Sequence, residues 1–138
     1  MVIAFTSHAN SSEENQWFEE SKDEISLFTG NYACGVYGKY TSELDAPMFP
    51  QKHFDISKRY LEIAVAKIKD KEKAKKMASK IYNGLEKNTL EKYKSFGPDG
   101  LKEYVIQAMN DKVYTYPKWI NNCRDLYTYS QTILETSI

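Results

Sequence analysis

The 138-residue chain contains few of the residues that mark several common protein classes. Two of its 19 basic residues are arginine, and it has two histidines and two cysteines. No apolar run is as long as a membrane-spanning helix. The cysteines, Cys34 and Cys123, form no CxxC motif and no spacing typical of a metal site. These absences argue against a membrane span and against a zinc module.

A secretory signal pattern is also missing. The apolar stretch at residues 2–5 is too short for the apolar core of a signal peptide, and no basic residue precedes it. We therefore expect a cytoplasmic protein with reduced thiols, in which Cys123 serves as a small core residue.

The sequence carries no complete phosphate-binding loop. Gly38-Lys39 is comparable to the end of such a loop, but Ala33 stands where the first glycine is required. Tyr40 stands where Ser or Thr should follow the lysine. A nucleotide site of this type is therefore not expected.

Metal and catalytic patterns are equally incomplete. His53 and Asp55 form an H-x-D pair, but no second pair of ligands accompanies them, and His8 is the only other histidine. No spacing identifies Cys34 as a nucleophile. We predict a non-enzymatic protein without a catalytic residue, a metal or a cofactor.

The composition is that of one globular domain. Hydrophobic residues make up 41% and charged residues 28% of the chain, which is ordinary for a folded protein. A chain of this length buries enough surface to fold without a disulfide or a metal. It also contains 11 tyrosines, which suit half-buried and interface positions.

Hydrophobic periodicity predicts an all-α, single-domain bundle of five or six helices over residues 1–138. We expect an extended arm at residues 1–10 and an irregular segment at residues 31–52, because Thr29-Gly30-Asn31 resembles a helix stop. The expected helices lie near residues 12–28, 55–69, 71–86, 99–110 and 118–135, with a shorter one from Thr89.

Local signals also predict the helix ends and the core. Asp55, Asp70 and Asp99 are candidate N-caps, and Pro117 suits the first turn of the last helix. The apolar stripes predict nine buried residues: Trp17, Leu61, Ile68, Met77, Ile81, Val105, Ile120, Leu126 and Leu134.

For residues 31–41 the sequence pattern fits either a short, glycine-weakened helix or an irregular hairpin. Tyr32, Tyr37 and Tyr40 alternate there with glycines, and we expect this segment to form an exposed loop. A second aromatic group, which surrounds Pro117, consists of Tyr114, Tyr116 and Trp119. That group is interpreted either as a recognition patch or as a staple that packs the last helix onto the core.

Charge is distributed unevenly, although the formal net charge is zero. Residues 1–50 hold two basic and eight acidic side chains, whereas residues 51–100 hold thirteen basic and seven acidic ones. The basic excess is greatest in residues 67–80. Either the acidic first helix packs against this basic segment, or both surfaces are exposed and can attract a charged partner.

These patterns favour a small protein-binding module, such as an inhibitor, an adaptor or an immunity-type protein. A protein partner is expected and self-association is a further prediction, whereas a membrane partner is not expected. The alternative is a nucleic-acid-binding protein that uses the basic helix at residues 67–80. The predicted partner-binding residues are Tyr37, Tyr40, Lys73, Lys76, Tyr114 and Tyr116.

Overall fold

The structure, a computed structural model, describes residues 12–41 and 50–136. The predicted arm at residues 1–10 lies outside this part of the chain. The described residues form six α-helices and one short 3-10 helix, with no strand, in one domain, which confirms the predicted all-α fold. The elements are α1 (Ser12–Glu20), α2 (Lys22–Thr41), α3 (Pro50–Val65), α4 (Lys71–Lys92), η2 (Lys94–Phe96), α5 (Gly100–Met109) and α6 (Thr115–Thr136).

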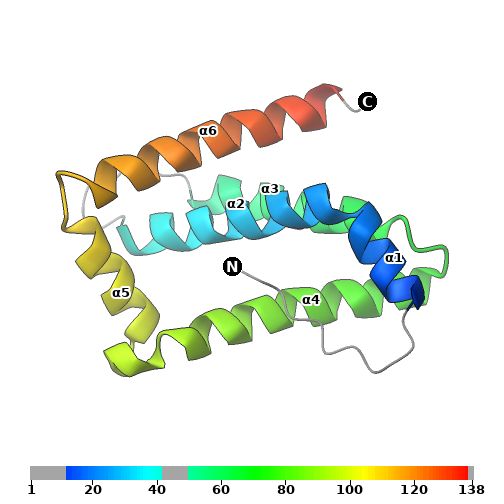
Figure 1. The fold of residues 1–138 in the computed structure, drawn as a ribbon, viewed down its shortest axis with the longest axis horizontal. Coiled ribbons are helices and arrows are strands. Elements are labelled where there is room, and N and C mark those ends of the chain that lie inside the picture. The colour runs from blue at the N-terminus through cyan, green and yellow to red at the C-terminus, as the bar shows by residue number, and fades with distance from the viewer. Residues whose placement is uncertain (1–11, 42–49, 137–138) are drawn as a thin grey trace.

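The pair α2 and α3 lies at the centre of the fold (Figure 1). Helix α6 packs against both members of this pair, and α4 packs against α3. Helix α5 crosses one end and contacts α2, α4 and α6. The long helices α4 and α6 therefore cover a central pair from two sides, and α5 closes one end.

Several helix ends follow their local signals, and one does not. Asp70 is the N-cap of α4, where its carboxylate accepts hydrogen bonds from the backbone N–H groups of Glu72 and Lys73. Asp99 occupies the N-cap position of α5, although its side chain makes no capping bond. The prediction that Asp55 caps a helix is wrong, because α3 already begins at Pro50.

The predicted stop at Thr29-Gly30-Asn31 is wrong, and α2 continues as a helix to Thr41. Its glycines permit close helix packing instead of ending the helix. A Cβ atom at Gly35 would lie 2.7–2.9 Å from the Phe54 ring of α3, and one at Gly30 would lie 3.0 Å from Leu126 of α6. Of the predicted irregular segment, residues 31–41 and 50–52 are therefore helical, and residues 42–49 lie outside the described residues.

The predicted core is largely correct. Trp17, Leu61, Ile81, Val105 and Ile120 are buried, with exposed fractions of 8% or less. The other four predicted residues are only partly buried, and they pack against the edge of the core: Ile68, Met77, Leu126 and Leu134. The periodicity therefore identified the correct faces of α4 and α6 but overestimated the burial of Met77, Leu126 and Leu134, and Ile68 lies beyond the end of α3.

A buried polar network joins α2, α3 and α6. The Asn31 amide nitrogen donates to Ser130 Oγ at 2.9 Å and to the Leu27 carbonyl at 2.8 Å. Its amide oxygen lies 3.0 Å from His53 Nδ1, so that Nδ1 carries the proton in this arrangement. Tyr60 donates to the Ser130 carbonyl at 2.6 Å. These bonds satisfy polar groups that would be costly to bury alone.

The expectation of reduced thiols is wrong. Cys34 of α2 and Cys123 of α6 form a disulfide, with Cα atoms 5.7 Å apart and 89 positions apart in the chain. Both residues are buried, so Cys123 does occupy the core, although not as a free thiol. The bond ties the central helix to an outer one, and no pattern local to either cysteine indicated this pairing.

Candidate functional site

The structure distributes the six predicted partner-binding residues over several surfaces. Tyr37 is half-buried against the core, and its ring stacks on Trp119 with centroids 4.1 Å apart. Burial, assisted by the nearby tyrosines Tyr93 and Tyr104, raises the pKa of Tyr37 to about 12. The exposed tyrosine loop predicted for this segment is therefore wrong, because the tyrosines lie on α2. Tyr32 is buried and Tyr40 is half-buried.

The aromatic group at the start of α6 divides into a core part and a surface part. Trp119 packs on Tyr37 and near Tyr104, as the staple interpretation expects. Tyr116 is half-buried, whereas 66% of Tyr114 is exposed. The packing of Trp119 agrees with the staple interpretation, and a recognition role for the exposed Tyr114 stays a prediction.

The turn between α5 and α6 (residues 110–114, called here the α5–α6 turn) presents two adjacent apolar side chains to solvent. Val113 is 92% exposed and Tyr114 66% exposed. Asp111 holds the turn: one carboxylate oxygen accepts from the backbone N–H groups of Val113 and Tyr114, at 3.3 and 3.2 Å. The other accepts from the backbone N–H and the hydroxyl of Thr115.

The same hydrogen bonds favour the ionised form of the Asp111 carboxylate. The hydrogen bond from the Thr115 side chain, followed by the one from the Tyr114 backbone, lowers the pKa of Asp111. Two lysines flank the turn. Lys112 Nζ lies 4.0 Å from the centroid of the Tyr116 ring, and Lys118 Nζ lies 5.4 Å from that of Tyr114. The turn is therefore a small apolar tip beside two cations.

Val113 belongs to this candidate site, although the sequence patterns did not predict it. Its signal was present: an apolar, β-branched residue stands in a short connection where polar residues are usual. The structure adds the hydrogen bonds of Asp111, which hold the Val113 backbone in place.

The lysines of the basic segment are all exposed, from Lys67 to Lys80. Lys73 and Lys76 are exposed near the beginning of α4, and further exposed lysines accompany them: Lys71, Lys75 and Lys80. The α5–α6 turn lies at the opposite end of the molecule from the start of α4 (Figure 1). A single protein interface of ordinary size would therefore not cover both the α5–α6 turn and the lysines at the start of α4.

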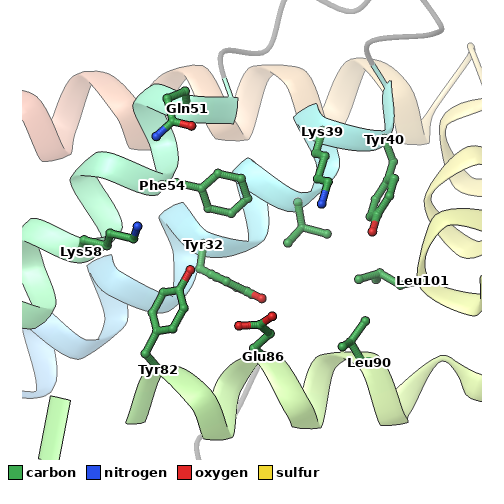
Figure 2. A pocket seen from close by; sticks show the side chains of 11 residues that line it. Tyr32, Lys39, Tyr40, Gln51, Phe54, Lys58, Tyr82, Glu86, Leu90 and Leu101 are labelled. Carbon is green, nitrogen blue, oxygen red and sulfur yellow. The ribbon is translucent and has the colours of Figure 1, made fainter. Parts of the chain in front are cut away.

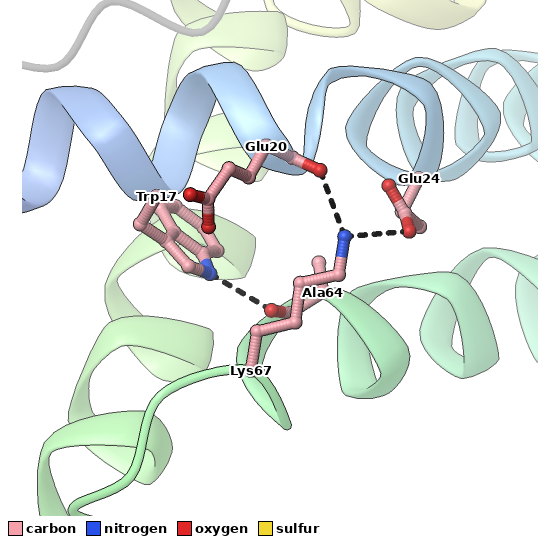
Figure 3. Close-up of polar contacts among 5 residues, drawn as sticks. All are labelled: Trp17, Glu20, Glu24, Ala64 and Lys67. Carbon is pink, nitrogen blue, oxygen red and sulfur yellow. Dashed lines mark hydrogen bonds and ion pairs between the residues drawn. The ribbon is translucent and has the colours of Figure 1, made fainter.

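Contact between the acidic and basic regions occurs through Lys67 (Figure 3). Lys67 Nζ donates to the Glu20 carbonyl and to Glu24 Oε1, both at 2.8 Å. Burial opposes the ionisation of Glu24, but the hydrogen bond and the charge of Lys67, together with a backbone hydrogen bond, lower the Glu24 pKa on balance. Trp17 Nε1 donates to the Ala64 carbonyl at 2.8 Å beside this pair. The acidic helix α1 thus packs at the end of α3, and the lysines of α4 beyond it remain at the surface.

A pocket of about 260 Å³ lies between α2, α3, α4 and the start of α5 (Figure 2). Its aromatic wall consists of Tyr32, Phe54 and Tyr82, with Tyr32 edge-on to both other rings at centroid distances of 5.8 and 6.0 Å. Tyr40 lines it as well. No local motif could indicate this pocket, because its lining residues come from four helices.

The two residues of the H-x-D pair lie in different environments. His53 is 4% exposed and bonded to Asn31 in the core, whereas Asp55 is exposed and accepts a hydrogen bond from Gln51. Within residues 12–41 and 50–136, no three His, Cys, Asp or Glu side chains are grouped so that they could hold a metal ion. In the same residues, no helix has both the length and the apolar character needed to cross a membrane.

No protein family, no curated protein sequence and no solved structure matches this chain significantly.

Proposed function

We propose that this protein is a small, non-enzymatic protein-binding module of the inhibitor, adaptor or immunity type, and that the α5–α6 turn is its main contact. The observation that supports the proposal is the adjacent exposure of Val113 and Tyr114 on a turn whose backbone Asp111 holds by hydrogen bonds. Tyr114 and Tyr116 keep the role predicted for them, and Val113 joins them.

The energetics of association favour such a turn. Burial of a valine side chain contributes roughly 1.5–3 kcal/mol, and tyrosine is enriched among the residues that dominate binding energy. A turn that is already ordered loses little conformational entropy when it binds. Val113 and Tyr114 can therefore contribute most of their apolar burial to affinity.

The charges beside the turn define the partner surface that would fit it. Lys112 and Lys118 stand next to the two aromatic rings, so the complementary surface is an apolar pocket with an acidic rim. An exposed ion pair adds only about 0–1 kcal/mol. The lysines would thus orient the partner and accelerate association, and the apolar pair would provide the affinity.

Site-specific photo-crosslinking in the native host tests this proposal. Tyr114 is replaced by p-benzoyl-phenylalanine in the full chain, and the matched control carries the same group at Tyr129, which is 59% exposed on α6. We expect one protein to crosslink at position 114 and not at position 129. The Val113→Ser variant should lose that crosslink.

Two outcomes would contradict the role of the turn. Equal crosslinking from positions 114 and 129 would indicate non-specific contact, and no crosslink from position 114 would leave the turn without a partner. A crosslinked product of twice the mass of the chain would identify a second copy as the partner and support the predicted self-association.

The predicted cytoplasmic location stays a prediction, and the disulfide weighs against it. Disulfides persist in oxidising compartments and are rare in the cytosol, and Cys34 and Cys123 are paired. An inhibitor or immunity-type protein that acts outside the cytosol is consistent with this pairing. Alkylation of free thiols in cells lysed directly into denaturant would test the location, because a cytosolic chain should then be labelled at both cysteines.

Nucleic-acid binding is a second candidate, supported by the row of exposed lysines on α4. Lysines supply point charges for phosphates, whereas base recognition more often uses arginine. Any such binding should be weakly sequence-specific and should decline steeply with added salt. Gel-shift titrations of DNA and RNA at low and at physiological salt would test it, and no shift at low salt would exclude it.

A further inference from the structure

The pocket between α2, α3, α4 and α5 combines an aromatic wall with charges of both signs, and neither feature is needed by the proposed protein contact. Tyr32, Phe54 and Tyr82 form the wall, and Leu90 and Leu101 contribute apolar surface. Leu90 is 50% exposed, so apolar surface continues to the mouth of the pocket. A planar apolar group packs well against edge-on rings of this kind.

The charged side chains reach the pocket from different helices. Figure 2 shows Glu86 extending from α4 toward the Tyr32 hydroxyl, with Lys58 on α3 and Lys39 on α2 across the opening. Lys58 Nζ lies 5.8 Å from the centroid of the Tyr82 ring, at the aromatic wall. An acidic group and basic groups thus stand at separate positions around one apolar wall.

Burial, together with the nearby Glu86 carboxylate, raises the pKa of Tyr32 to about 12. The Tyr32 hydroxyl therefore stays neutral at physiological pH and can donate or accept a hydrogen bond. It offers a third polar contact between the aromatic wall and the carboxylate of Glu86.

The size of the pocket limits the ligand. Its volume of about 260 Å³ is below the roughly 300–1,000 Å³ of sites that hold drug-sized molecules. A single ring with a short polar substituent fits this space, whereas a nucleotide or a lipid chain exceeds it.

We propose that this pocket binds a free aromatic amino acid. The ring lies against Tyr32, Phe54 and Tyr82, the carboxylate faces Lys58, and the ammonium group faces Glu86. This arrangement matches each charged group of the ligand with an opposite charge on a different helix, and it places the apolar part of the ligand on the aromatic wall. A zwitterion with a planar side chain is the simplest molecule that provides all three groups.

The test is a titration of the full ¹⁵N-labelled chain with L-phenylalanine, followed by NMR. We expect a dissociation constant of about 1 mM or below, with shifts concentrated at residues that line the pocket. L-Alanine, which lacks the ring, should cause none of these shifts. No shifts at about 10 mM L-phenylalanine, or shifts spread evenly over the surface, would overturn the proposal.

Two analogues separate the charged contacts. Phenylpropionate lacks the ammonium group, and L-phenylalaninamide lacks the carboxylate, so each should bind about tenfold more weakly than L-phenylalanine. Equal binding of phenylpropionate would overturn the role of Glu86. Equal binding of the amide would overturn the choice of a free amino acid and indicate the N-terminal residue of a peptide instead.

Variants at exposed positions test the same contacts from the protein side. Glu86→Gln should weaken L-phenylalanine about tenfold and leave phenylpropionate unchanged, and Lys58→Gln should weaken L-phenylalanine and leave the amide unchanged. Glu91→Gln and Lys87→Gln are matched controls, because both residues are exposed on α4 outside the pocket lining. If the controls weaken binding as much as the pocket variants, only the overall charge matters and the proposal fails.

Discussion

Helices α2 and α4 have similar lengths, 20 and 22 residues, but they occupy different positions in the fold. Helix α2 contacts α3, α5 and α6 and has buried residues along most of its length, including Phe28, Asn31 and Val36. Among the residues of α4, only Ile81, Leu85 and Thr89 are buried. A helix that is covered on several sides shows no apolar stripe, so α4 could be recognised from periodicity whereas the second half of α2 could not.

The largest difference between the two helices should appear on truncation of an apolar side chain. Phe28→Ala in α2 should lower the free energy of unfolding by about 3–5 kcal/mol, because Phe28 is fully buried. Leu90→Ala in α4 should cost less than about 1 kcal/mol, because half of Leu90 is exposed. Urea unfolding followed by circular dichroism measures both changes, and equal losses would show that the outer face of α4 is covered.

The disulfide gives α2 a covalent link that α4 lacks. A chain in which Cys34 and Cys123 are both replaced by Ala should lose about 2–5 kcal/mol of stability, since the bond closes a long loop. Urea unfolding with and without a reductant measures this effect. The reductant should destabilise the original chain and leave the double variant unchanged. An effect of reductant on the variant would point to a cause other than this bond.

Glycine substitutions should change stability in opposite directions in the two helices. A Cβ atom at Gly35 of α2 would lie 2.7 Å from the Phe54 ring, whereas one at Gly84 of α4 would meet no atom within 4 Å. Gly35→Ala should therefore cost about 1–3 kcal/mol through overpacking. Gly84→Ala should stabilise by about 0.5–1 kcal/mol, because alanine favours the helix. Thermal unfolding would compare the two, and a stabilising Gly35→Ala would show that α2 and α3 pack loosely.

Acidification should lower the stability of the fold through His53, which belongs to the buried polar network that joins α2, α3 and α6. Burial lowers the pKa of His53 below its ordinary value of 6.5, so the unfolded chain binds a proton more readily than the folded chain. Stability should therefore be full above pH 6.5 and decline as the pH falls below it. Urea unfolding between about pH 5 and pH 7 measures this slope. His53→Gln should flatten it, whereas His8→Gln should leave it unchanged if His53 is responsible.

The smallest effect on stability is expected from the exposed lysines of α4. Lys73→Glu combined with Lys76→Glu should change the free energy of unfolding by less than about 0.5 kcal/mol, because both side chains are exposed. Loss of salt-dependent nucleic-acid binding in this variant would favour the alternative function.

Lys112→Glu combined with Lys118→Glu is the matched pair at the α5–α6 turn. If only this pair weakens association with the crosslinked protein, the turn is the contact; unfolding of the α4 variant would instead give its lysines a structural role.

The sequence predicted only part of the candidate site at the start of α6. Tyr114 lies at the surface as a recognition residue requires, and its neighbour Trp119 packs into the core as a staple. In the sequence, both residues are simply aromatic side chains near Pro117. They differ in burial because the Tyr37 ring stacks on Trp119, whereas Tyr114 lies at the surface. That information comes from packing between helices, which no single segment contains.

Sequence alone determined the features that depend on neighbours along the chain. The helical class, the Asp70 cap and the buried face that includes Ile81 follow from spacings of three and four residues and from local hydrogen bonds. Only the tertiary structure decided the continuation of α2 through its glycines, the Cys34–Cys123 bond and the pocket beside Tyr32. These features depend on which helices pack against each other. Such contacts join residues that are tens of positions apart in the chain, so no local sequence pattern can predict them.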